Sequence, residues 1–186
     1  EGAGLCGLCG ERRSGSGGAV GWFDGDCYSD AWASHSSCGW CGRVGWAGVS
    51  ALSGDCLAGP LVYPPQTVPA GELHAATQIL RHAVAGARLG HDAASIGQGL
   101  LRGRVWCCAT TRAFADLWKL FWDALNDIGK NLAVLHKVKA HTTVAQLRAG
   151  LITVADRDGN EAADKLARLA VKAHPVDECA DVRFKR

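Results

Sequence analysis

Four acidic residues, far apart in the chain, have the surroundings expected of catalytic carboxylates. Asp24 follows an apolar run that begins at Val20, and a glycine comes directly after it. This order is typical of a mostly buried strand that delivers one acid to a place where the backbone must stay uncrowded. A buried carboxylate is costly unless a cation or hydrogen-bond donors lie close by. For the dipeptide Asp24-Gly25 taken alone, an ordinary turn is the alternative.

The other three acids are Glu72, Asp92 and Asp164. Glu72 and Asp92 lie at the starts of predicted helices, where the helix dipole and helix capping, respectively, offer local explanations. Asp164 lies on the predicted last helix, three residues after Glu161 and on the same face. Four carboxylates that converge without arginine partners nearby in sequence would form a site for a hard cation, such as Mg²⁺ or Mn²⁺.

The hydrophobic pattern predicts an α/β domain that could bring these acids together. A strand ending at Asp24, a long hairpin loop over 29–42 and strands over 43–50 and 55–63 would form an antiparallel meander. Helices are predicted where apolar residues recur every three or four positions. The expected order after the meander is helix 69–84, short strand 87–92, helices 92–101 and 110–127, strand 131–140 and helix 158–171.

Composition favours a soluble globular domain. Of the 186 residues, 48% are hydrophobic and 20% are charged, which is outside the range of disordered chains. The apolar runs are far shorter than the roughly 20 residues of a membrane span, so we expect an intracellular, soluble protein with no membrane partner. Residues 1–19 are predicted to be a Gly/Ser-rich linker, 20–172 the domain and 173–186 a tail. The chain contains no methionine, and we expect it to be a segment of a longer protein.

The nine cysteines include two Cys-x-x-Cys pairs. Cys6 with Cys9 and Cys38 with Cys41 could together form a tetrahedral zinc site. Both pairs are embedded in glycine and one lies in the predicted linker, so unstructured or buried thiols are the favoured interpretation and bound zinc is not expected. The other five are predicted to be reduced thiols.

Five short motifs resemble the type 1 ribonuclease H family, and especially its retroelement members. They extend from about residue 20 to 172. The most specific is the last, an Asn-Glu-x-x-Asp-x-Leu-Ala helix that follows a Val-Lys-x-His strand. The motifs are Phe23-Asp24-Gly25, Gln66-Thr67 with Ala70 to Leu73, Asp92 before a helix of small residues, Lys137 to His141, and Gly159 to Arg168.

The resemblance implies a ribonuclease H-like fold: a five-stranded mixed sheet, with three antiparallel strands and then two parallel ones, flanked by helices. It implies hydrolysis of the RNA strand of RNA–DNA hybrids with two Mg²⁺ ions, or Mn²⁺, which leaves 3′-hydroxyl and 5′-phosphate ends. The metal-binding acids would be Asp24, Glu72, Asp92 and Asp164, with Asp24 bridging both ions. His141 would be the mobile loop histidine that assists turnover.

The resemblance also implies contacts with the nucleic acid. The backbone at Gly25 and Asp26 would lie against the RNA and Thr67 against a DNA phosphate, while selectivity would come from 2′-hydroxyl groups and duplex shape. A basic rim is predicted from four lysines: Lys119, Lys130, Lys137 and Lys139. In the retroelement context the domain would belong to a polyprotein that includes a reverse transcriptase.

Three other functions fit the sequence less well. A catalytically inactive ribonuclease H-like domain could serve as a nucleic-acid-binding or connecting module, but four retained acids repel one another without a cation. An integrase or transposase would need a differently spaced helix acid. A zinc module would depend on the two cysteine pairs.

Overall fold

A mixed five-stranded sheet of order β3-β2-β1-β4-β5 forms the centre of the molecule. The computed structural model describes residues 25–34, 43–62, 65–84, 86–129, 134–140 and 142–174. Antiparallel pairing joins β2 to both β1 and β3, and parallel pairing joins β4 to both β1 and β5. This arrangement confirms the predicted fold. The strands are β1 (Asp26–Ser34), β2 (Arg43–Ser50), β3 (Cys56–Pro60), β4 (Arg88–His91) and β5 (Val134–Lys137).

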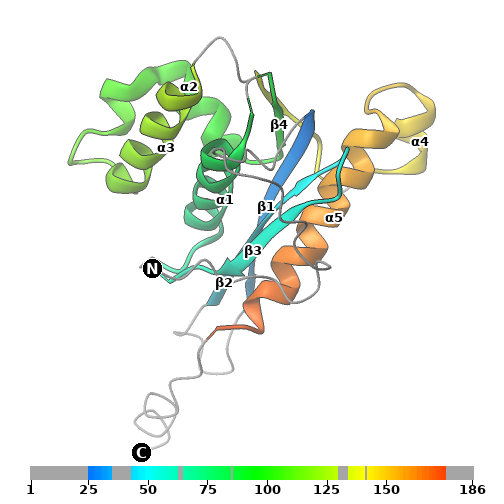
Figure 1. Cartoon of the computed structure of the whole chain (residues 1–186), viewed down its shortest axis with the longest axis horizontal. Helices are drawn as coiled ribbons and strands as arrows, with labels where there is room; N and C mark the ends of the chain where they lie inside the picture. The colour runs from blue at the N-terminus through cyan, green and yellow to red at the C-terminus, as the bar shows by residue number, and fades with distance from the viewer. Residues whose placement is uncertain are drawn as a thin grey trace, which may run out of the picture.

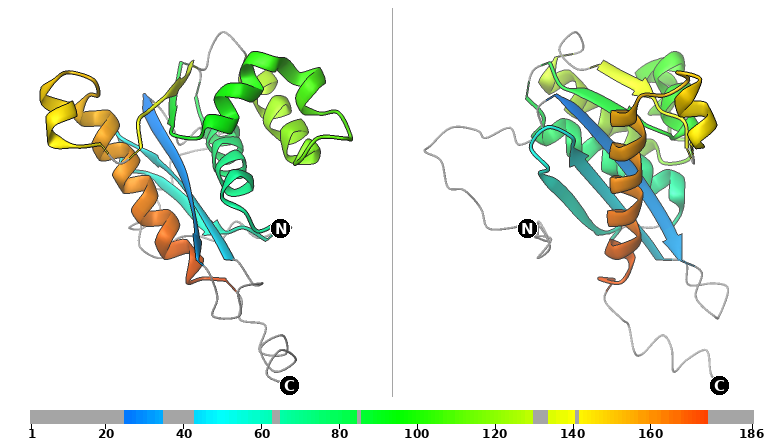
Figure 2. Two further views of the ribbon diagram at one scale, coloured as in Figure 1. Left: turned by 180° about the vertical axis from the view of Figure 1, so that it is seen from behind. Right: turned by 90° about the vertical axis from the view of Figure 1, so that its right-hand side faces the viewer.

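Helices cover both faces of this sheet (Figure 1). One face carries α1, which packs on β1 and β2, with α3 against α1 and α2 against α3. The other face carries α5, which packs on β1 and β2, as the two views of Figure 2 show. The helices are α1 (Val68–His82), α2 (Ala94–Cys107), α3 (Ala115–Ile128), α4 (Val144–Arg148) and α5 (Val154–Val171).

Each face of the sheet has its own apolar core. On the side of α1 to α3, Ile79, Trp118 and Phe121 belong to one buried cluster. Their three-and-four spacing along α1 and α3 is the pattern from which these helices were predicted. On the side of α5, Tyr28 packs with Ala163 in a smaller cluster. Cys27 belongs to the first cluster and Tyr28 to the second, so strand β1 contributes to both cores.

The hairpin loop predicted over 29–42 is wrong for its first part. Strand β1 continues to Ser34, which pairs with Arg43 of β2. Ser29 and Asp30 are 2% and 8% exposed, so polar residues typical of loops occupy a buried strand. The remaining residues of that segment, 35–42, lie outside the described part of the chain, as does the strand expected to end at Asp24.

Four helix starts also differ from the prediction, and the helix predicted over 110–127 begins at Ala115. Helix α1 begins at Val68, so Glu72 lies in its second turn, where the dipole effect is weaker. Helix α2 has Ala93 as its N-cap, so Asp92 precedes the cap, and this helix continues past a kink at Gly103. Helix α5 begins four residues earlier than expected, at Val154, with the Thr153 hydroxyl accepting a hydrogen bond from an amide of its first turn.

The described cysteines are mostly free thiols. Cys27 and Cys107 are buried and Cys108 is partly exposed. Cys56 is disulfide-bonded, so the prediction of a reduced thiol is wrong at this position. Both Cys-x-x-Cys pairs lie outside the described residues. None of the helices in the described ranges combines the length and hydropathy needed to cross a bilayer.

Candidate metal centre

Three carboxylates from three different elements converge beside the end of β4. Asp30 lies on β1, Glu72 on α1, and Asp92 directly after β4. Each offers one oxygen, and these three oxygens all lie within 4.8 Å of one another. We call these residues the acidic triad. Asp30 is 8% exposed and the other two are half-buried.

Strand register explains why Asp30 and Asp92 meet. Ser29 of β1 pairs in parallel with His91, the last residue of β4, so the next residue of each strand lies at the same level. Beyond His91 the chain leaves the sheet, and this opens a space beside β1. The carboxyl ends of parallel strands are a common location for ligand sites in open α/β sheets.

Close packing of α1 on the sheet brings in Glu72. Gly71 faces the sheet, and a Cβ atom added there would lie 2.5 Å from Cγ1 of Val44 and 2.7 Å from Cβ of Ala31. Only a residue without a side chain allows the helix to approach β1 and β2 so closely. The next residue, Glu72, is thereby held near Asp30.

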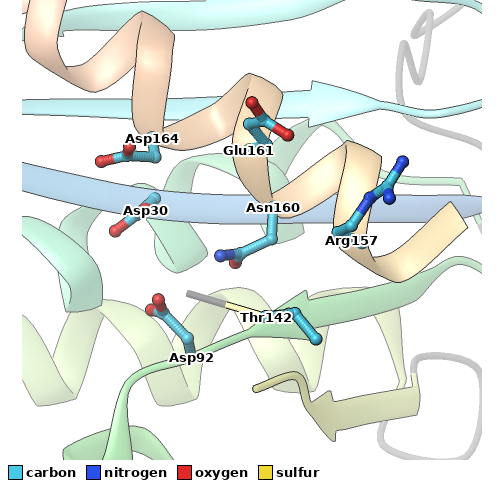
Figure 3. A pocket seen from close by; sticks show the side chains of 7 residues that line it. All are labelled: Asp30, Asp92, Thr142, Arg157, Asn160, Glu161 and Asp164. Carbon is cyan, nitrogen blue, oxygen red and sulfur yellow. The ribbon is translucent and has the colours of Figure 1, made fainter. Parts of the chain in front are cut away.

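Helix α5 closes the site from the other side. A hollow of about 290 Å³ is lined by Asp30 and Asp92 of the triad together with residues of α5 and Thr142. Figure 3 shows Asn160 directed from α5 toward Asp92 and Asp164 lying next to Asp30, whereas Glu161 points away. Asn160 is 8% exposed, and its side-chain oxygen has no hydrogen-bond partner among the described residues. That oxygen is therefore a buried, unsatisfied acceptor in the wall of the hollow.

A partly buried polar network fixes the start of α5. The Asp156 carboxylate accepts hydrogen bonds from the Tyr28 hydroxyl at 3.0 Å and the Thr153 hydroxyl at 2.7 Å, and His136 Nε2 lies 3.1 Å from it. These partners belong to β1, to the N-cap of α5 and to β5. Burial alone raises the pKa of Asp156, but the hydrogen bonds from Thr153, His136 and Tyr28 outweigh it and lower the pKa. Gly159 then lets α5 approach the Tyr28 ring.

The triad is electrostatically strained without a cation. Burial, and then the charge of Asp92, raise the pKa of Asp30 to about 8, with smaller contributions from the charges of Asp164 and Glu72. Burial and the charge of Asp92 also raise the pKa of Glu72 to about 7. Carboxylates held together in this way favour either a shared proton or a bound cation.

The donor set fits a hard divalent cation. All three triad ligands are carboxylate oxygens, and the amide oxygen of Asn160 and the carboxylate of Asp164 face the same hollow. Mg²⁺ and Mn²⁺ prefer oxygen ligands of this kind and retain some water, for which the hollow has space. The residues present would therefore hold such an ion.

Two of the four predicted metal-binding acids, Glu72 and Asp92, lie in the triad. Asp164 lines the same hollow but is outside the triad, and it forms an ion pair with Arg168. Asp24 lies outside the described residues, and Asp30 occupies the β1 position of the triad. Sequence reasoning missed Asp30 because its neighbours were assigned to a loop. The available signal was the alternation of large residues, Tyr28 and Trp32, around it.

The residues predicted to contact substrate are only partly described. Gly25 has a positive φ of 61°, and Asp26 forms an ion pair with Arg88 at 3.2 Å. Asp26 and Asp30 are four residues apart on β1, so their backbones are separated by about 13 Å along the extended strand. Asp26 therefore lies away from the acidic triad. Thr67 is the N-cap of α1, and its hydroxyl is buried without a hydrogen-bond partner in the described part of the chain. His141 lies outside the described residues, although Thr142 after it lines the hollow.

Comparison with solved structures identifies the architecture. The solution structure of the PFV RNase H domain superposes with a TM-score of 0.62 at 17% sequence identity, covering 83% of this chain and 98% of that one. The chain has a ribonuclease H-like fold. No family model and no curated protein sequence matches it. At this identity, the likeness establishes the ribonuclease H-like fold and leaves activity to be argued from the site.

The same fold occurs within a larger viral protein. The foamy viral protease-reverse transcriptase, solved in complex with an RNA/DNA hybrid, matches with a TM-score of 0.61 at 12% identity over 90% of this chain. The ribonuclease H-like chain spans 22% of that protein's length. A structure of the foamy viral protein with double-stranded DNA gives a TM-score of 0.58 at 15% identity.

Proposed function

We propose that this domain is a metal-dependent endonuclease that hydrolyses the RNA strand of RNA–DNA hybrids, leaving 3′-hydroxyl and 5′-phosphate ends. The observation that carries this proposal is the convergence of Asp30, Glu72 and Asp92 within 4.8 Å on a ribonuclease H-like fold. Support for the substrate comes from the neighbouring structure solved with an RNA/DNA hybrid.

The acids have separate roles in this proposal. Two Mg²⁺ ions bound at the site would activate the attacking water and stabilise the departing 3′ oxygen. Asp30 would take the central position that the resemblance implied for Asp24, because its carboxylate feels the charges of Asp92, Asp164 and Glu72. Glu72 and Asp92 would complete one ion site, and Asp164 would serve the second. Asn160 orients water or a phosphate oxygen through its unpaired amide oxygen.

His141 is proposed to assist proton transfer and product release. Its neighbours Ala140 and Thr142 both line hollows that reach Asp92. An imidazole can exchange a proton near neutral pH, so a histidine there could protonate the leaving oxygen.

Recognition of the hybrid would depend on its backbone and shape. Gly25, Asp26 and Thr67 remain proposed contacts, the first two to RNA and the last to a DNA phosphate. The Thr67 hydroxyl is buried, so this contact requires its side chain to rotate. Lys137 and Lys139 line an open hollow beside Asp92, whereas Lys119 is paired with Asp116.

Cleavage of a hybrid with a labelled RNA strand tests the proposal. The purified domain should cut the RNA strand with Mg²⁺ or Mn²⁺ and not with EDTA. Asp30→Asn and Asp92→Asn should each abolish cleavage, whereas Asp127→Asn, which changes an exposed acid on α3, should not. Asp24→Asn decides which of the two acids is required: retained activity assigns the role to Asp30.

A catalytically inactive binding module is the alternative. It predicts that the domain binds the hybrid equally well with and without metal and never cleaves it. It would also leave the triad carboxylates buried together with no cation to offset their repulsion, which is unfavourable. Binding without cleavage at every metal concentration would therefore overturn the nuclease proposal.

A further inference from the structure

Asp164 is already engaged by a cation from its own helix. Nε of Arg168 donates hydrogen bonds to both carboxylate oxygens of Asp164, at 3.1 and 3.0 Å. A second guanidinium nitrogen lies 3.0 Å from Oδ2. Both oxygens that could bind a metal ion therefore already accept a hydrogen bond from the guanidinium group.

Arg168 is itself held in place by an aromatic ring. Its guanidinium carbon lies 3.7 Å from the centre of the Trp32 ring, within the range of a cation–π interaction. Trp32 is two residues after Asp30 on β1, so both side chains face α5. The guanidinium is thus fixed between the indole and the carboxylate, beside the acidic triad.

We propose that Arg168, supported by Trp32, is a built-in competitor for the second metal ion. The inference rests on the proposed metal site. An ion can bind the triad while Arg168 stays on Asp164, because the triad ligands come from β1, α1 and the end of β4. A second ion needs an Asp164 oxygen, and there it competes with the guanidinium for the same negative charge. The second ion therefore binds more weakly than it would without Arg168.

How strongly Arg168 competes with the second ion depends on how far the Arg168–Asp164 pair is exposed to water. The side chains of Arg168 and Asp164 are 46% and 22% exposed, so the pair is only partly shielded from water. Ion pairs of this kind change an equilibrium by about two- to fivefold. Arg168 should therefore weaken the second ion without preventing its binding. A purely positioning role, in which Arg168 orients Asp164 toward the ion, predicts the opposite sign.

Titration calorimetry of the metal-free domain with Mn²⁺ tests the inference independently of cleavage. Arg168→Gln should tighten the second, weaker binding event about two- to fivefold and leave the first within experimental error. Trp32→Leu keeps the Arg168 guanidinium but removes the ring that holds it in place. This variant should tighten the second binding event by less than Arg168→Gln does. Lys165→Gln, which removes an equal charge from an exposed position on the same helix, is the matched control and should change neither event.

The outcomes separate this inference from the proposed function. If wild-type protein binds no Mn²⁺, or if Asp30→Asn leaves binding intact, the metal site itself is wrong and the inference is wrong with it. If Mn²⁺ binding requires Asp30 but Arg168→Gln leaves the second binding event unchanged or weakens it, the metal site stands. Only the inference that Arg168 competes with the second ion is then wrong. Equal tightening of both events by Arg168→Gln would indicate a general charge effect and would also overturn it.

Discussion

Asp30, the proposed central metal ligand, works against the stability of the fold that holds it. Its ordinary pKa is 3.8 and its pKa in the folded domain is about 8. The folded state therefore binds a proton that the unfolded state has already released at neutral pH. The contribution of Asp30 to the free energy of unfolding is fully present below about pH 4. It is lost as the pH rises toward 8. A bound cation would reverse this loss.

Asp30→Asn should therefore stabilise the metal-free domain at neutral and higher pH. We expect a gain of at least about 1 kcal/mol at pH 8, or about 2–4 °C in the unfolding temperature, and little gain at pH 4. Thermal unfolding in EDTA at both pH values measures the gain. Adding Mg²⁺ should stabilise the wild-type domain and not the variant. A variant no more stable than wild type at pH 8 would contradict the pKa argument.

At the scale of elements, the site depends on how closely α1 and α5 approach β1. The approach of α1 depends on Gly71, where an added Cβ would meet Val44 at 2.5 Å. Gly71→Ala should cost about 1–3 kcal/mol through overpacking and move Glu72 away from the triad. Chemical denaturation measures the first effect, and Mn²⁺ affinity measures the second.

Gly97→Ala is the matched control for this substitution. Gly97 lies in α2 with no atom within 4 Å of an added Cβ, so alanine should leave stability unchanged or raise it by about 0.5–1 kcal/mol. If the two substitutions have equal effects, close packing at Gly71 does not position α1.

The hydrogen-bond network around Asp156 positions α5 against the sheet, as close packing at Gly71 positions α1. Asp156→Asn replaces a carboxylate that accepts hydrogen bonds from Tyr28 and Thr153, and we expect a loss of about 1.5–3 kcal/mol at pH 7. Because the folded-state pKa of Asp156 is lowered, its contribution is present above about pH 4 and is lost as the pH falls through that lowered pKa. Wild type and variant should therefore converge in stability at low pH.

Asp158→Asn provides the comparison for Asp156→Asn. Asp158 is also near the start of α5, but its side chain is 54% exposed and pairs with Arg157 at the surface. This variant should lose less than about 1 kcal/mol. A similar loss in both variants would show that the network adds nothing beyond a helix-terminal charge.

At the scale of the whole molecule, nucleic-acid binding should be controlled by cations near the site. Lys137 and Lys139 lie beside Asp92, whereas Lys119 is paired with Asp116 at 2.8 Å. Replacing Lys137 and Lys139 together with glutamine should reduce the slope of log affinity against log salt concentration by about one to two. Lys119→Gln should change the slope less. Binding of a hybrid by the Asp30→Asn variant across a salt series provides the measurement.

The sequence predicted the architecture better than it predicted the site. Periodic helices such as α3, and strand β2 with its predicted bounds of 43–50, were found as expected because apolar spacing alone defines them. The part of β1 after Tyr28 was assigned to a loop because its buried polar residues, Ser29 and Asp30, break the apolar pattern. The meeting of Asp30 with Glu72 depends on parallel register and on helix packing, neither of which a local pattern contains.

The register of β1 also limits how this domain can change in evolution. One residue inserted between Tyr28 and Ser29 would turn the acid toward the opposite layer, and two would restore its orientation but carry it about 7 Å past Asp92. Neither length change preserves the triad. Insertions and deletions in related sequences should therefore be found in the connecting loops and be missing from this strand.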